Sequence, residues 1–109
     1  MKLLIKNGHV IDPVNGLNNI SNIWIDGSKI VGVGKKPNVF IKSREMDASG
    51  LVVCPGFVDI GTHLREPGLE YKGTIASEAT AAAAAGFTTL YCTPNTTPVI
   101  DTPAVVELI

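Results

Sequence analysis

The sequence predicts an α/β protein in two parts, a small β-rich part followed by the start of a parallel βαβα arrangement. Two observations lead to this prediction. Residues 1–55 contain short apolar runs separated by turn residues and have no helical period, whereas residues 56–109 alternate between strand-like and helix-like segments. Pro55-Gly56 stands where the first pattern gives way to the second.

The first part is expected to form a small sheet or sandwich. Two strands, Leu3–Ile5 and His9–Ile11, flank Asn7-Gly8, which is a strong hairpin signal. Turn residues also stand at Asp26-Gly27 and at 48–50. Further strands are expected at 23–25, 29–33 and 51–54, with a weaker one at 39–41.

The second part is expected to alternate strands and helices. Thr74–Ala85 is predicted as a helix, because Thr74 can cap the first turn, alanine favours helix and Gly86 suits its end. The other expected elements are strands at Phe57–Ile60 and Phe87–Cys92, loops at 64–73 and 94–98, and a second helix that opens at Pro103. Two parallel strands leave open edges, so we expect this chain to be the front of a larger α/β protein.

Composition narrows the class of protein. The chain of 109 residues is 45% hydrophobic and 17% charged with a net charge of −1, which is typical of a globular domain. Such a weak charge favours neither nucleic acid nor a membrane surface, and no apolar run approaches the ~20 residues of a membrane span. Cys54 and Cys92 lack C-x-x-C spacing, which favours two buried free thiols in a reducing cytoplasm over a disulfide.

Residues able to bind a ligand follow the carboxyl ends of both predicted parallel strands, where α/β proteins place their sites. His63, Arg65 and Glu66 follow the first strand, and Thr93 and Asn95 follow the second. The planar guanidinium of Arg65 suits a carboxylate, although a surface ion pair with Glu66 or Glu70 would explain it equally well. His63 alone could be a hydrogen-bonded residue at a strand end, and Asn95 could form an Asx-turn.

The motifs His63-Leu64-Arg65-Glu66-Pro67-Gly68 and Pro94-Asn95-Thr96 lie within PGFVDIGTHLREPGLEYKGTIASEATAAAAAGFTTLYCTPNTTPV. This stretch resembles the front of a dihydroorotase, a cyclic amidohydrolase of pyrimidine synthesis. The preceding strands resemble the start of the small sandwich domain that amidohydrolases carry. Allantoinases and dihydropyrimidinases share the strands and the alanine-rich helix, but usually not the Leu-Arg-Glu-Pro-Gly sequence.

The resemblance implies a (β/α)8 barrel with zinc at its mouth, preceded by a small β-sandwich portion. Residues 1–55 would be strands of the sandwich domain, and residues 56–109 the first two βα units. The implied reaction is the ring closure of N-carbamoyl-L-aspartate to dihydroorotate in the cytoplasm. Arg65 and Asn95 match substrate contacts, and His63 matches the second histidine of a zinc-binding H-x-H pair. The remaining zinc ligands and the catalytic aspartate would lie on later strands, so no catalytic residue is assigned here.

Gly61 departs from this pattern, because it occupies the position of the partner histidine. Residues i and i+2 of a strand share a face about 6.6 Å apart, which lets two imidazoles reach one ion. Thr62 is expected on the opposite face, and Asp59 on the correct face but one pleat deeper. Zinc binding at His63 is therefore predicted to be weak or absent.

Three functions remain open. The chain could belong to a dihydroorotase, or to a non-catalytic dihydroorotase-like protein with a structural role beside aspartate transcarbamoylase. It could also belong to a related cyclic-amide hydrolase of the allantoinase or dihydropyrimidinase type. The expected ligand is a small molecule, with a homo-oligomer or aspartate transcarbamoylase as the protein partner and with neither nucleic acid nor membrane involved.

Overall fold

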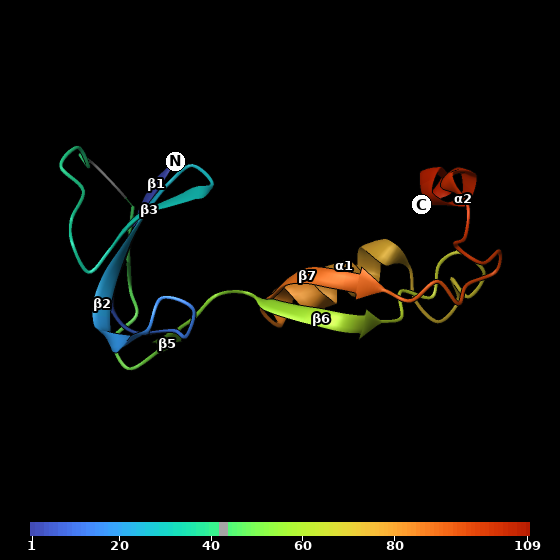
Figure 1. The fold of residues 1–109 in the computed structure, drawn as a ribbon, viewed down its shortest axis with the longest axis horizontal. Coiled ribbons are helices and arrows are strands. Elements are labelled where there is room, and N and C mark those ends of the chain that lie inside the picture. Colours follow the sequence, from blue (N-terminus) through green and yellow to red (C-terminus); the bar gives the residue numbers. More distant parts are fainter. Residues whose placement is uncertain (42–43) are drawn as a thin grey trace. The chain divides into compact units, whose positions relative to one another are not determined.

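The computed structural model describes residues 1–41 and 44–109. The chain divides into two compact units, Met1–Pro55 and Gly56–Ile109 (Figure 1). Strands and helices are both present, which confirms the α/β class. Within the described ranges, no helix has the length and apolar character needed to cross a membrane.

The first unit is one sheet, with five strands among the described residues. The order is β3-β2-β1-β4. The short β5 pairs with the same strand β1, at residues that come after those paired with β4. β2 runs antiparallel to both of its neighbours, β1 and β3, whereas β4 and β5 run parallel to β1. The strands are β1 (Lys2–Asp12), β2 (Leu17–Asp26), β3 (Lys29–Val33), β4 (Arg44–Asp47) and β5 (Val52–Val53). The buried apolar side chains are Val10, Ile23, Trp24, Phe40 and Ala48.

The hairpin predicted at Asn7-Gly8 is wrong. β1 continues through this pair, and its register against β2 shifts there, as in a β-bulge. Asn7 has φ = 62°, a left-handed conformation that both hairpin turns and bulges use, so the local signal fits either structure. Contacts from distant strands favour the bulge: the Asn7 backbone N–H donates to Asn22 Oδ1 (3.0 Å) and its Nδ2 donates to Asp47 Oδ1 (3.2 Å). The chain reverses at Pro13–Gly16 instead.

The predicted strand at 39–41 is also absent from the described part of the chain. Phe40 is buried, while Val39 and Ile41 are exposed, so this apolar run contributes one core side chain without sheet pairing. The strand that follows, β4, was not predicted, because its sequence Arg-Glu-Met-Asp has no apolar pattern. Its pairing with β1 makes it a strand. The turn predicted at Asp26-Gly27 is confirmed, with Gly27 at φ = 62°.

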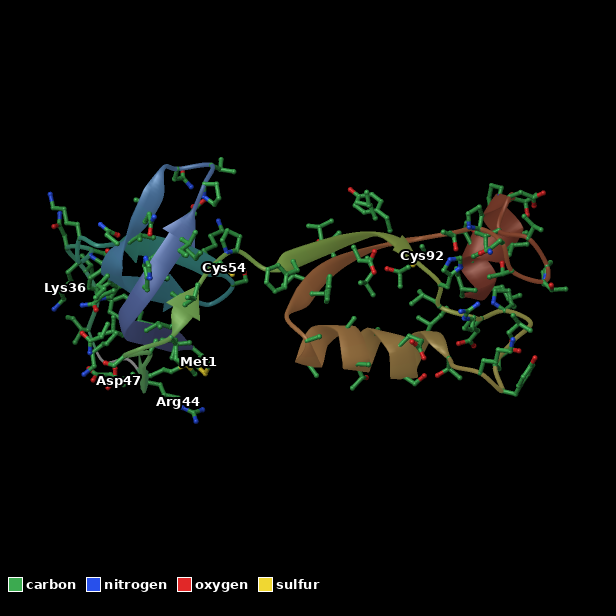
Figure 2. The ribbon with its side chains drawn as sticks, turned by 90° about the horizontal axis from the view of Figure 1, so that it is seen from below. Met1, Lys36, Arg44, Asp47, Cys54 and Cys92 are labelled. Atoms are coloured by element: carbon green, nitrogen blue, oxygen red, sulfur yellow. The ribbon has the colours of Figure 1, made fainter. Side chains whose placement is uncertain are left out.

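Both cysteines are free, as predicted, but both are exposed rather than buried (Figure 2). Cys54 follows the last strand of the first unit, and Cys92 ends β7 of the second. Burial was expected from the usual behaviour of free cysteine. In each case, the rest of the unit covers little of the cysteine side chain.

The second unit contains two parallel strands, β6 (Phe57–Thr62) and β7 (Phe87–Cys92), with helix α1 (Ile75–Ala84) between them in sequence. Helix α1 lies against β7 (Figure 2), and the short helix α2 (Pro103–Leu108) follows. The parallel pairing and the helix that opens at Pro103 confirm the predicted order of elements. Both strands therefore deliver their carboxyl ends to the same edge of this small sheet.

Local sequence accounts for the bounds of α1. Thr74 Oγ1 accepts the Ser77 backbone N–H (3.2 Å), and Ser77 Oγ accepts the Thr74 backbone N–H (2.9 Å), which forms a reciprocal capping box. At the other end, Gly86 has φ = 92°, a left-handed conformation that favours glycine. The helix is thereby set to begin directly after the loop that carries Arg65.

Candidate functional site

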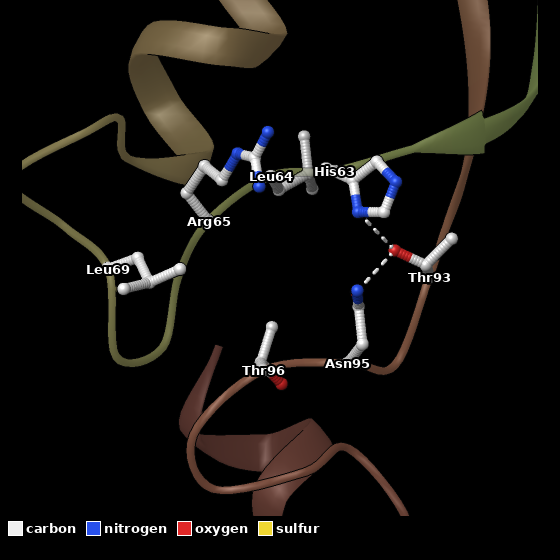
Figure 3. A pocket seen from close by; sticks show the side chains of 7 residues that line it. All are labelled: His63, Leu64, Arg65, Leu69, Thr93, Asn95 and Thr96. Atoms are coloured by element: carbon white, nitrogen blue, oxygen red, sulfur yellow. Dashed lines mark hydrogen bonds between the residues drawn. The ribbon is translucent and has the colours of Figure 1, made fainter.

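Two loops meet beyond the carboxyl ends of β6 and β7. The Thr93 backbone N–H donates to the Thr62 carbonyl (3.0 Å), and the Thr97 N–H donates to the Pro67 carbonyl (3.0 Å). A small pocket between the loops has an accessible space of about 10 Å³, about the room for one water molecule. Its lining residues are His63, Leu64, Arg65, Leu69, Thr93, Asn95 and Thr96 (Figure 3). The structure thus brings together the three residues that the sequence singled out for ligand binding.

His63, Thr93 and Asn95 form a hydrogen-bonded chain across the two loops (Figure 3). Thr93 Oγ1 lies 3.0 Å from His63 Nδ1 and donates to Asn95 Oδ1 at 2.7 Å. The hydroxyl of Thr93 is part-buried, whereas the His63 and Asn95 side chains are exposed. The sequence placed Thr93 at this strand end together with Asn95 but gave it no separate role. The available signal was its place directly after β7, two residues before Asn95.

Arg65 forms no ion pair with any described residue. The two glutamates expected to compete for it bind backbone N–H groups instead. Glu66 Oε2 accepts the Ile75 N–H (2.7 Å), and Glu70 Oε1 accepts the Gly68 N–H (2.8 Å), which holds the pKa of Glu70 below its usual range. The exposed guanidinium of Arg65 is therefore left for a ligand.

The backbone of Arg65 is strained. Its φ is 68°, a left-handed conformation that costs a non-glycine residue about 1–2 kcal/mol. The Arg65 carbonyl accepts the Leu69 N–H (2.8 Å), and the next residue, Glu66, anchors the loop to the positive N-terminal end of α1. These contacts on both sides hold Arg65 in the conformation that lines the pocket. Strain of this kind is concentrated at functional sites.

The expectation that Asp59 shares a face with His63 is wrong. Asp59 and Thr62 pair with Leu90 and Cys92, which are two residues apart on β7 and so share a face. The register of β6 shifts between these pairs, which interrupts the simple alternation of faces. Asp59 therefore lies on the side of Thr62, and its Oδ1 accepts the Gly61 N–H (2.9 Å).

Gly61 is not required by the backbone or by the space around it. Its φ lies outside the left-handed region, and a Cβ added at this position would meet no atom within 4 Å. A larger side chain would fit. The described residues therefore do not by themselves require glycine at position 61.

The described residues do not make a zinc site on their own. A catalytic zinc ion needs about three protein ligands and a water. Among residues 1–41 and 44–109, no three His, Cys, Asp or Glu side chains are grouped so that they could hold a metal ion. His63 is the one imidazole that lines the pocket.

Solved structures define the class of protein. The chain is similar to the L-hydantoinase (dihydropyrimidinase) from Arthrobacter aurescens, with a TM-score of 0.81 and 26% identity over 97% of this chain and 24% of that one. It is also similar to a D-hydantoinase, with a TM-score of 0.72 and 32% identity over 86% of this chain and 20% of that one. The fold is that of the N-terminal part of amidohydrolase structures.

Sequence comparison then identifies the family. A family model described as dihydro-orotase-like matches residues 50–109. A dihydroorotase-like protein of Pseudomonas putida is 48% identical over 109 residues, and a dihydroorotase of Aquifex aeolicus is 47% identical over 110 residues. The chain belongs to the dihydro-orotase-like family, which confirms the resemblance seen in its motifs. Each alignment covers 100% of this chain and 26% of the relative, so the chain spans about a quarter of their length.

Proposed function

We propose that the protein is a dihydroorotase-like cyclic amidohydrolase of pyrimidine biosynthesis in the cytoplasm, acting on N-carbamoyl-L-aspartate and dihydroorotate. The observation that carries the proposal is that Arg65, whose guanidinium pairs with no carboxylate among the described residues, lies in one pocket with His63 and Asn95. Both proposed ligands carry a carboxylate, which a planar guanidinium binds through two parallel hydrogen bonds. Family membership supports the same substrate class.

Asn95 is proposed as the second substrate contact. Its Oδ1 accepts the Thr93 hydroxyl, so its Nδ2 is left to donate to a carboxylate or amide oxygen of the ligand. With space for about one water molecule, the pocket cannot enclose such a ligand. The ligand would lie on the open side of the pocket and reach Arg65 and Asn95 from there.

Zinc is the cofactor that the family resemblance implies, with His63 as one ligand. A bound zinc ion would polarise the amide carbonyl and activate a water molecule. The residues of this chain contribute the recognition part of the site: Arg65 and Asn95 orient the ligand, and Thr93 orients His63. Gly61 contributes no ligand, so zinc binding in this protein is proposed to be weak.

For the fold, we propose that residues 1–55 belong to a small β-sandwich domain and residues 56–109 to the first two βα units of a (β/α)8 barrel. Open apolar surface in each unit supports this arrangement. In the first unit, β1, β2 and β3 line a groove of about 250 Å³ with mainly apolar side chains. In the second, Val58 and Ile60 of β6 are 53% and 85% exposed. Further strands of a sandwich and of a barrel would cover these surfaces.

A second candidate function is that of a non-catalytic dihydroorotase-like protein, and Gly61 favours it. The glycine removes a proposed metal ligand at a position where the fold would accept a histidine. Such a protein would bind the same ligands without turnover and act as a homo-oligomer or beside aspartate transcarbamoylase. A related hydrolase of hydantoins or allantoin is less well supported, because Arg65 is suited to a carboxylate that hydantoin and allantoin lack.

The test is a calorimetric titration of dihydroorotate into the protein at its natural length, with ring opening measured in parallel. Arg65→Ala should weaken binding about 10–100-fold, because a hydrogen bond to a charged group contributes about 1.5–3 kcal/mol. Arg44→Ala, on the exposed strand β4 of the other unit, is the matched control and should not change binding.

Turnover would support the enzyme, and binding without turnover would support the second candidate. Tighter binding of hydantoin or allantoin than of dihydroorotate would contradict both.

A further inference from the structure

We propose that Thr93 is a positioning residue that holds the neutral His63 imidazole in the tautomer with its proton on Nδ1. The lone pair of the ring then lies on Nε2. This deepens the proposed function, because it concerns the same pocket, but the tautomer itself does not depend on which ligand binds.

The inference follows from counting protons around the Thr93 hydroxyl. This hydroxyl has one proton to donate, and its oxygen can accept others. Two of its neighbours can only accept: Asn95 Oδ1 at 2.7 Å and the Thr62 carbonyl at 3.4 Å. The proton of Thr93 therefore points to one of these acceptors. The third contact, to His63 Nδ1 at 3.0 Å, must then be a donation by the ring.

The position of the Thr93 oxygen is set by the sheet. The backbone N–H of Thr93 donates to the Thr62 carbonyl (3.0 Å), so the residue continues the pairing of β6 with β7 by one step. Thr62 directly precedes His63 in the sequence. The Thr93 hydroxyl and the His63 ring are therefore both attached to backbone segments that are hydrogen-bonded to each other. A change of ligand in the exposed pocket would not displace this contact.

The tautomer decides what His63 can do. A neutral imidazole has one lone pair, and a hydrogen bond to one ring nitrogen determines which nitrogen carries it. With Nδ1 engaged by Thr93, Nε2 can accept a proton from a ligand or bind a cation, and no described residue bonds to it. Residues that orient a histidine in this way commonly tune its affinity as a ligand.

The first test reads the tautomer in the unaltered protein. Nitrogen-15 labelling of the histidines in the natural-length protein, followed by two-bond proton–nitrogen correlation at a pH where the ring is neutral, distinguishes the two tautomers. His63 should show a protonated Nδ1 and an unprotonated Nε2, with its signals assigned by their loss in His63→Gln. A protonated Nε2 in the unaltered protein would overturn the proposal.

Substitutions then separate positioning from simple support of the fold. Thr93→Val keeps the size but removes the acceptor, so His63 should lose its preference for the Nδ1 proton, and Thr93→Ser should restore it. Asn95→Ala should keep the tautomer, because the Thr62 carbonyl still takes the Thr93 proton, while dihydroorotate binding falls. A tautomer unchanged by Thr93→Val in a folded variant would refute the role of Thr93. If the tautomer is as stated but dihydroorotate does not bind, the proposed function fails and the positioning role stands.

Discussion

Replacement of Gly61 by histidine is the most direct test of why the site departs from its family pattern. The fold should accept the change, since a Cβ at this position meets no atom within 4 Å and the backbone is not left-handed. Removing a glycine from a strand gains about 0.5–1 kcal/mol of stability through lower chain flexibility. The free energy of unfolding of Gly61→His should therefore be unchanged or slightly higher.

The larger effect is expected on zinc affinity. Loss of a residue that merely supports a metal ligand costs about 10–100-fold in affinity, and a direct ligand should contribute at least the upper value. Gly61→His should thus bind zinc at least about 100-fold more tightly, which corresponds to about 2.8 kcal/mol. The gain should vanish when His63→Gln is added, because the two imidazoles act together.

Calorimetric titration of zinc into the metal-free, natural-length protein measures this directly. Gly61→Ala is the matched control, since it also replaces the glycine and adds a Cβ but supplies no metal ligand. A parallel assay of ring closure separates the two candidate functions: gained activity supports the enzyme, and gained zinc binding without activity supports the non-catalytic protein. Tight stoichiometric zinc binding with Gly61 in place, or an equal gain from Gly61→Ala, would refute the missing-ligand explanation.

Two further predictions concern stability, both measured by urea unfolding. Thr74→Ala should lower the free energy of unfolding by about 1 kcal/mol, because it removes the side-chain cap of α1, while Thr80→Ala within the same helix should have a smaller effect. An equal loss in both variants would contradict this role of the cap. Hydrogen bonds to the Asp47 carboxylate, first from the Ser49 hydroxyl and then from Asn7, lower the pKa of Asp47 in the folded state. The contribution of these bonds to the free energy of unfolding is therefore fully present above the unfolded-state pKa of about 4. It is lost as the pH falls from there through the lower folded-state pKa. Asp47→Asn should be less stable at neutral pH and lose less stability on acidification, and a pH dependence identical to that of the unaltered protein would contradict the assignment.

Local sequence was sufficient for helix α1 and strand β7 of the second unit, whereas β6 extends to Thr62, two residues past its predicted end at Ile60. Helix α1 begins at a threonine cap and ends before a glycine, and both signals act within a few residues. Strand β7 has the bounds predicted from its aromatic and β-branched residues. Such elements could be predicted because their free energy depends mainly on neighbours in sequence.

Other elements depended on partners far along the chain. Asn7-Gly8 suits a turn or a bulge, and hydrogen bonds to Asn22 and Asp47 accompany the bulge. Strand β4 has no strand pattern and forms because β1 offers it a free edge. The face of Asp59 was misjudged because a register shift cannot be read from alternation alone.

The candidate site divides in the same way. The sequence by itself determined that His63, Arg65 and Asn95 follow the ends of two strands. Because these residues lie in short motifs, it also determined the family, whose members include dihydroorotases. Only the tertiary structure decided that the Thr93 hydroxyl lies between His63 and Asn95, and that Glu66 binds the start of α1 rather than Arg65. The physical reason is that the bond between Thr93 and His63 joins residues 30 positions apart, so it exists only once β6 and β7 pair in parallel.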